Sequence, residues 1–153
     1  MRFHLLAMPN AQTTKAYSLD GFCSATIRMA RLLKHLGHEV ILYASEENEA
    51  PCDELVQVVT KEEQETLLGD VPYQYSGFYP SVFPLWALAN KRMIREIGKR
   101  KQEKDFILTL GGVSQEEIAK AHPDLMTVEY SVGYRNSFSS YRVFESHYWR
   151  GWA

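Results

Sequence analysis

The chain has 153 residues, of which 45% are hydrophobic and 24% are charged, and its formal net charge is −2. This composition is typical of one globular domain that buries a core of its own, and it excludes a disordered chain. The near-neutral charge gives no general attraction to nucleic acid, so no nucleic-acid partner is expected, and contact with a membrane surface would need a local basic patch.

The apolar stretches are too short to cross a bilayer, and the first residues lack the hydrophobic region of a signal peptide. These features predict a cytoplasmic protein. Cys23 and Cys52 lie in different predicted elements, without the spacing of a zinc or redox motif. Both are therefore expected to be free thiols.

The first part of the chain predicts a strand, a helix and two further strands. Residues 3–8 form a short apolar run that predicts a strand leading into a polar loop. Residues 22–36 carry apolar side chains at helical spacing, and Gly37 stands where a helix would end. Two runs rich in β-branched residues then predict strands over 39–44 and 55–60.

The rest of the chain continues the alternation. Thr60 and Glu63 are placed as the capping box of a helix over 61–68, and the aromatic, turn-rich segment 71–79 is expected to be a loop. A long amphipathic helix is predicted from Ser81, with a basic face that is most simply solvated. The remaining predicted elements are a strand over 106–110, a short helix from Ser114 and a strand over 125–130.

Alternating strands and helices predict a single α/β domain over residues 1–153. The expected architecture is a Rossmann-like three-layer domain, with a parallel sheet of about five strands in the order 3-2-1-4-5. Ligands of such sheets bind beyond the carboxyl ends of the strands, where the strand order reverses. That point falls at the loop 10–14 and at the turn formed by Gly111 and Gly112.

The loop after the first strand offers Gln12, Thr13 and Thr14, which could bind a hydroxylated ligand or belong to a solvated connection. The chain has neither the glycine fingerprint of a dinucleotide site nor a Walker A sequence, so no nucleotide cofactor is expected. Gly111 and Gly112 could allow a ligand to approach the backbone, or they could form a plain turn.

Glu129 is predicted near the carboxyl end of the fifth strand, where it could act as a base or be an ordinary surface carboxylate. Gly37 separates His35 from His38 and ends their helix, so no metal site is expected. The aromatic and charged segment 128–152 does not have the composition of a disordered tail and is expected to approach a site; His147 within it stays a candidate.

Three segments carry a resemblance to a known family: LLAMPNAQTTKAYS, LLKHLGHEVILYAS, and DFILTLGG followed by VEYSVGY and YRVFES. With them the chain resembles the N-terminal, acceptor-side half of a GT-B glycosyltransferase, most closely a group of bacterial and viral enzymes. The chain departs from this group at Asn10, where the related sequences tend to have histidine. An acid-base role at that position is therefore in doubt.

The resemblance implies transfer of a sugar from a nucleotide-sugar donor, bound by a C-terminal domain, to a sugar or glycan acceptor bound by the N-terminal domain. Such enzymes usually need no metal, since helix dipoles and basic side chains can stabilise the leaving diphosphate. Thr13 and Thr14 would form hydrogen bonds, Glu129 would bind the acceptor or act as a base, and Arg142 and Glu145 would organise the cleft. By this resemblance the residues lining the acceptor side or the interdomain cleft are Gln12, Thr13, Thr14, Gly111, Gly112, Glu129, Gly133, Tyr141, Arg142 and Glu145.

The 153 residues include no second domain that could bind the donor. The chain is therefore expected to be inactive alone and to be completed by a C-terminal domain, by a partner or by a second copy. The alternative is a non-catalytic Rossmann-like module that binds a sugar or a protein. A nucleotide-dependent oxidoreductase is disfavoured by the missing glycine fingerprint, and contact of the basic helix face with anionic lipid is the minor alternative.

Overall fold

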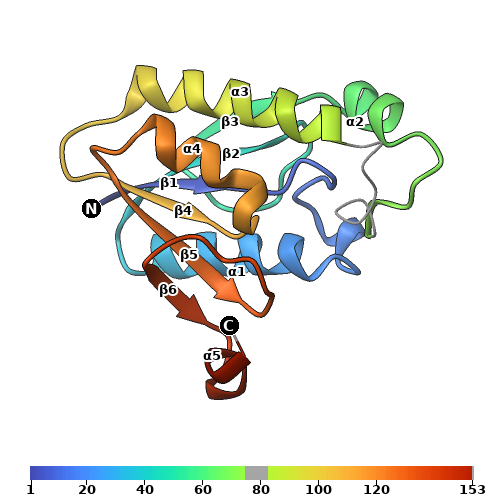
Figure 1. The fold of residues 1–153 in the computed structure, drawn as a ribbon. Coiled ribbons are helices and arrows are strands. Elements are labelled where there is room, and N and C mark those ends of the chain that lie inside the picture. Colours follow the sequence, from blue (N-terminus) through green and yellow to red (C-terminus); the bar gives the residue numbers. More distant parts are fainter. Residues whose placement is uncertain (75–82, 153) are drawn as a thin grey trace.

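A computed structural model of the chain describes residues 1–74 and 83–152 (Figure 1). Its centre is a parallel sheet of six strands in the order β3-β2-β1-β4-β5-β6. The predicted Rossmann-like α/β fold and the predicted order of the first five strands are confirmed. The strands are β1 (Arg2–Leu6), β2 (Glu39–Ser45), β3 (Glu54–Val59), β4 (Phe106–Thr109), β5 (Met126–Val132) and β6 (Tyr141–Phe144).

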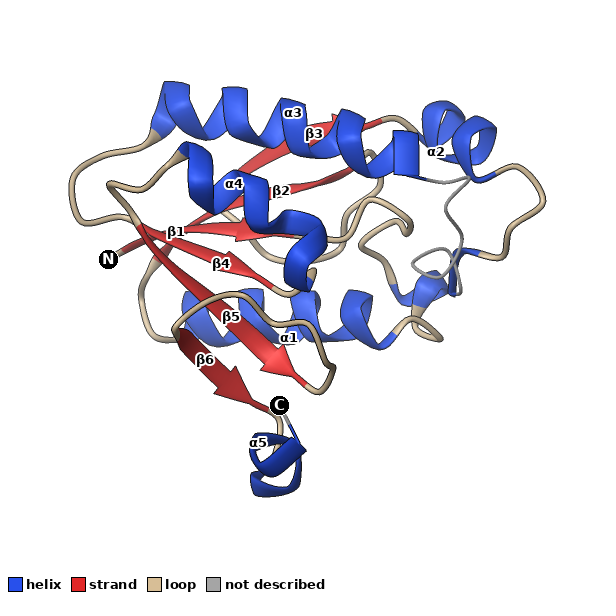
Figure 2. Cartoon of the chain, in the orientation of Figure 1, coloured by secondary structure: helices blue, strands red, loops and turns tan. Residues whose placement is uncertain are grey.

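Helices cover both faces of the sheet, with α1 on one face and α2, α3 and α4 on the other (Figures 1 and 2). The predicted start of the long helix at residues 81 and 82, and residues 75–79 of the predicted loop, lie outside the described residues. Within the described ranges, no helix is long and apolar enough to cross a membrane. The helices are α1 (Gly21–His35), α2 (Lys61–Leu68), α3 (Phe83–Arg100), α4 (Glu116–Ala121) and α5 (His147–Trp152), with 3-10 turns η1 (Lys15–Tyr17) and η4 (Gly112–Gln115).

Neighbouring residues of each central strand pack into opposite halves of the core. Leu5 of β1 and Leu42 of β2 belong to the half under α1, whereas Leu6 and Tyr43 belong to the half that contains Met93 of α3. This arrangement follows from the alternation of side chains along a strand. It explains why the central strands are continuous apolar runs in the sequence.

The helix ends follow the local sequence. Asp20 accepts hydrogen bonds from the backbone N–H groups of Phe22 (2.8 Å) and Cys23 (3.4 Å) and so caps the N-terminus of α1. The predicted capping box of α2 is present, since Thr60 Oγ1 accepts from Glu63 N and Glu63 Oε2 accepts from Thr60 N, both at 3.0 Å. The ends of these helices were therefore predictable from a few residues.

The structure adds a sixth strand and a terminal helix that the sequence did not predict. β6 pairs in parallel with β5, with Tyr141 opposite Val128 and Arg142 opposite Glu129. Its first three residues are exposed, so it lacks the apolar alternation from which a half-buried strand is recognised. The segment predicted to approach a site thus extends the sheet before α5 begins.

Candidate functional site

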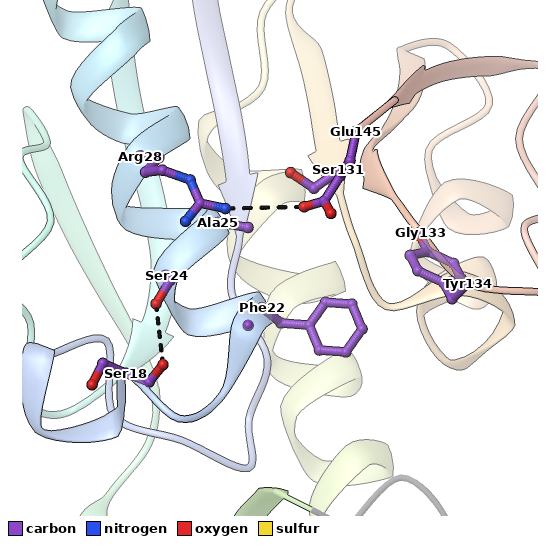
Figure 3. Close-up of a pocket in the computed structure, with 10 residues that line it drawn as sticks. Ser18, Phe22, Ser24, Ala25, Arg28, Ser131, Gly133, Tyr134 and Glu145 are labelled. Atoms are coloured by element: carbon purple, nitrogen blue, oxygen red, sulfur yellow. Dashed lines mark hydrogen bonds and ion pairs between the residues drawn. The ribbon is translucent and has the colours of Figure 1, made fainter. Parts of the chain in front are cut away.

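A pocket of about 430 Å³ lies between the first two turns of α1 and the segments that follow β5 and β6 (Figure 3). Because α1 begins at the edge of the sheet where the strands end, this is the edge at which Rossmann-like folds bind ligands. The lining residues are Ser18, Gly21, Phe22, Ser24, Ala25, Arg28, Ser131, Gly133, Tyr134 and Glu145.

One wall of the pocket is the side of α1 that faces the segments after β5 and β6. Ser24 and Arg28 are four residues apart and therefore lie on one side of the helix, next to the small side chain of Ala25. Ser24 Oγ donates to the backbone oxygen of Ser18 at 3.5 Å, a long hydrogen bond that a better acceptor could replace (Figure 3). This wall thus presents hydroxyl groups and one guanidinium.

Two aromatic rings supply the apolar part of the pocket. The rings of Phe22 and Tyr134 meet edge to face, with centroids 5.9 Å apart and planes at 64° (Figure 3). Burial, reinforced by the nearby Glu129 carboxylate, raises the pKa of Tyr134. Its hydroxyl therefore stays protonated and donates to Glu129 Oε1 at 3.1 Å.

The β5 side of the pocket has an unusual backbone. Ser131 has a φ of 51°, and the pairing of β5 with β6 shifts register between Glu129 and Val132. A non-glycine residue in this region costs about 1–3 kcal/mol, and such strain gathers at functional sites. The irregularity ends regular pairing where Ser131 and Gly133 enter the lining.

An ion pair spans the rim. Arg28 Nη2 lies 3.9 Å from Glu145 Oε1, and the two side chains are 65% and 45% exposed (Figure 3). A long, exposed pair of this kind adds at most about 1 kcal/mol, so a ligand could readily separate it. The rim therefore offers one cation and one carboxylate.

Only part of the predicted site lies at this pocket. Gly133 and Glu145 line it, and Thr14 lines a smaller neighbouring groove. Arg142 lies with Glu145 and His147 at a more open hollow of about 510 Å³ along β6 and the start of α5. Arg142 Nε donates to Ser139 O at 2.6 Å. Tyr141 is 55% exposed on the same strand and does not line the pocket.

Glu129 is completely buried, unlike a surface carboxylate or an open base. Besides the Tyr134 hydroxyl, its carboxylate accepts hydrogen bonds from the backbone N–H groups of Phe138 (2.9 Å) and Ser139 (2.8 Å). Both oxygens are therefore used to hold the loop between β5 and β6. In this structure Glu129 organises the wall of the pocket rather than reaching into it.

The Gly111–Gly112 turn is filled by the protein itself. A Cβ on Gly111 would lie 2.6 Å from the Gln115 side chain, and one on Gly112 would lie 2.9 Å from the backbone oxygen of Asn136. Gly112 also has a φ of 55°, which favours glycine. These glycines allow Gln115 and the backbone of Asn136 to lie close to the turn.

In the loop 10–14, Gln12 and Thr13 are buried by other parts of the protein. Gln12 is fully buried; its Oε1 accepts from Glu47 N at 2.7 Å, and its Nε2 donates to Gln64 Oε1 at 3.0 Å. Thr13 is buried and forms a parallel bridge with Asn48. The loop ties β1 to the segment after β2, and the open pocket lies toward β5 and β6.

Sequence reasoning missed eight of the ten lining residues: Ser18, Gly21, Phe22, Ser24, Ala25, Arg28, Ser131 and Tyr134. Ser24 and Arg28 did carry a signal, since outward-facing polar residues four apart at the start of the first helix face the carboxyl edge of a Rossmann-like sheet. The strained backbone of Ser131 has no such signal in the sequence.

Within residues 1–74 and 83–152, no group of three His, Cys, Asp or Glu side chains is placed to hold a metal ion. Cys23 and Cys52 are free thiols, as predicted. Comparisons of the chain with protein-family models, with curated proteins and with solved structures find no match. The fold is Rossmann-like, and the pocket beside α1 is its candidate functional site.

Proposed function

We propose that this chain is the acceptor-binding half of a GT-B type glycosyltransferase and that the pocket beside α1 binds a sugar of the acceptor. The observation that carries the proposal is a pocket at the carboxyl edge of a Rossmann-like sheet that combines serine hydroxyls, aromatic rings and a separable Arg–Glu pair. The resemblance of the sequence to the N-terminal half of these enzymes supports the same function.

The lining matches the chemistry of a sugar. A sugar ring carries hydroxyl groups that both donate and accept hydrogen bonds, and serine hydroxyls can do the same. Phe22 and Tyr134 offer apolar surface for the C–H groups of the ring. The volume of about 430 Å³ lies within the roughly 300–1,000 Å³ of small-molecule sites.

In this proposal Glu145, and not Glu129, is the carboxylate that contacts the acceptor. Glu129 is buried and fully bonded, whereas Glu145 lies on the rim with 45% of its side chain exposed. Glu145 would accept a hydrogen bond from an acceptor hydroxyl, and the nucleotide-sugar donor would be held by a second domain. No metal or other cofactor is part of this proposal.

Binding of simple sugars tests the proposal. The ¹⁵N-labelled chain is titrated with glucose, galactose, N-acetylglucosamine and maltose, and amide shifts are followed at Ser24, Ser131 and Gly133. We expect saturable shifts at the pocket with at least one sugar, weakened in Ser24→Val and unchanged in the matched variant Ser140→Ala, since Ser140 is exposed and lies outside the pocket. Absence of pocket shifts with every sugar would refute sugar binding.

The alternative, a non-catalytic binding module, is favoured by one observation. β6 forms an edge of the sheet, and Tyr141 and Val143 on it are 55% and 52% exposed. An exposed edge strand with apolar side chains can pair with a strand of another protein. If Val143→Lys abolishes binding of a protein partner and Ser24→Val does not, the function would be assigned to this edge instead of the pocket.

A further inference from the structure

A second groove, of about 160 Å³, adjoins the pocket along α1 and shares Ser18, Ser24 and Arg28 with it. A ligand that occupies the pocket can therefore extend into the groove without leaving the surface of the helix. The lining residues of the groove are Thr14, Lys15, Ser18, Ser24, Ile27, Arg28 and Arg31.

The charged residues of the groove are all cations. Arg28 and Arg31 are three residues apart on α1 and so lie on one side of the helix, and Lys15 approaches from the preceding turn. No carboxylate belongs to the lining. Positive charge is thus concentrated in one place on a chain whose formal net charge is −2.

These cations also lack the partners that most basic side chains of this protein have. Lys34 Nζ lies 2.6 Å from Asp53 Oδ1, and Arg92 Nη1 lies 2.7 Å from Glu63 Oε2. Within the described ranges, Lys15 and Arg31 form no ion pair between side chains, and Arg28 has only the 3.9 Å contact with Glu145. The groove therefore carries more positive than negative charge: Glu145 makes only a long contact with Arg28, and Glu49 Oε2 accepts from the backbone N–H of Lys15 at 2.6 Å rather than from its side chain.

Two hydroxyl side chains, Thr14 and Ser24, also belong to the lining of the groove. Thr14 Oγ1 is buried and has no hydrogen-bond partner among the described residues, which is uncommon for a buried hydroxyl. Ser24 Oγ has only its long bond to Ser18 O. Guanidinium, ammonium and hydroxyl groups together are the donors that bind phosphate and sulfate oxygens.

We infer that the groove binds a phosphate or sulfate group of the same ligand whose sugar ring occupies the pocket, so that the acceptor is an anionic sugar. The part of this inference that concerns the sugar rests on the proposed function. The anion-binding part rests on Thr14, Lys15, Arg28 and Arg31 and can be tested separately.

The test compares three probes on the full chain at low ionic strength: glucose, glucose 6-phosphate and inorganic phosphate. Amide shifts report on the pocket at Ser131 and Gly133 and on the groove at Lys15 and Arg31. We expect glucose 6-phosphate to bind roughly 10-fold more tightly than glucose, as one or two charge-assisted hydrogen bonds would give. Raising the salt concentration should weaken the phosphate ester and leave glucose unchanged.

Arg31→Gln should remove this roughly 10-fold advantage and leave glucose binding intact. Its matched control is Lys91→Gln, which removes an exposed charge from α3 on the other face of the sheet and should change neither affinity. Vesicles of phosphatidylcholine with and without phosphatidic acid form a further arm: sedimentation that needs both phosphatidic acid and Arg31 would assign the phosphate to a lipid headgroup.

The outcomes separate the two proposals. Equal affinity for glucose and its phosphate ester, with no shift at Lys15 or Arg31, would overturn the anionic groove and leave the proposed function standing. Inorganic phosphate that shifts Lys15 and Arg31, with no sugar shifting Ser131 or Gly133, would support the groove and refute sugar binding. If none of the three probes, and none of the other sugars titrated above, shifts either region, both proposals are overturned.

Discussion

Replacing Glu129 tests whether it holds the pocket wall or serves as a base. Glu129→Ala removes a fully buried carboxylate and leaves the backbone N–H groups of Phe138 and Ser139 and the Tyr134 hydroxyl without their acceptor. Glu129→Gln keeps the shape: its amide oxygen can accept from both backbone groups, and its NH₂ can donate to a reoriented Tyr134 hydroxyl.

The two variants should therefore differ greatly in stability. Each buried donor left unpaired costs about 1–3 kcal/mol, so Glu129→Ala should lose roughly 3–5 kcal/mol once partial access of water is allowed. Glu129→Gln loses mainly the contribution of the charge, about 1–2 kcal/mol. Because domains are stable by about 5–15 kcal/mol, the alanine variant should still fold at low temperature.

Urea unfolding followed by circular dichroism measures these losses as shifts of the midpoint at unchanged m-value. Glu103→Ala is the control, since Glu103 is an exposed carboxylate in a loop and should stay within about 0.5 kcal/mol of the parent chain. A loss below about 1 kcal/mol in Glu129→Ala would refute the loop-holding role. Sugar binding that vanishes in a stable Glu129→Gln variant would restore a direct role for this carboxylate.

Three further changes probe other features of the fold. Gly112→Ala should lower the free energy of unfolding in urea by about 1–3 kcal/mol, because φ of Gly112 is positive and a Cβ would lie 2.9 Å from Asn136 O. Gly151→Ala is the control: a Cβ there meets open space and should not destabilise the protein. Thr60→Ala should cost about 1 kcal/mol through loss of the capping box of α2, seen as a lower melting temperature. Burial lowers the pKa of His4, so as the pH falls through about 6.5 the imidazole is protonated in the unfolded state before it is protonated in the folded state. The free energy of unfolding should therefore decrease below that pH. His4→Gln should flatten the dependence of the urea midpoint on pH.

The fold was predictable because local signals and the global pattern agree. The apolar runs of β1 and β2, the helical spacing of α1 and the capping box of α2 each define an element within a few residues. β6 was missed because its pairing with β5 is its main stabilisation, and backbone hydrogen bonds to a neighbour leave no trace in a strand with exposed side chains.

The site was less predictable because burial is decided by neighbours distant in the sequence. Gln12 is polar and follows a strand, which are the marks of a ligand loop, yet Gln64, from 52 positions later, closes over it. Tyr134 fills the space beside Gly112 in the same way. A polar residue at a switch point can bind either a ligand or another loop, and its spacing in the sequence is the same in both cases.

The contacts of one loop help to explain why the pocket lies beside α1 and not at the Gly111–Gly112 turn. The loop between β5 and β6, anchored by Glu129, packs Tyr134 and Asn136 against Gly112, which follows β4. The same loop brings the Tyr134 ring against Phe22 and so forms part of the wall of the pocket. One buried carboxylate thereby holds the loop that packs against Gly112 and shapes the wall of the pocket. A variant that loosens this loop should weaken ligand binding in the pocket, even though Glu129 itself does not line the pocket.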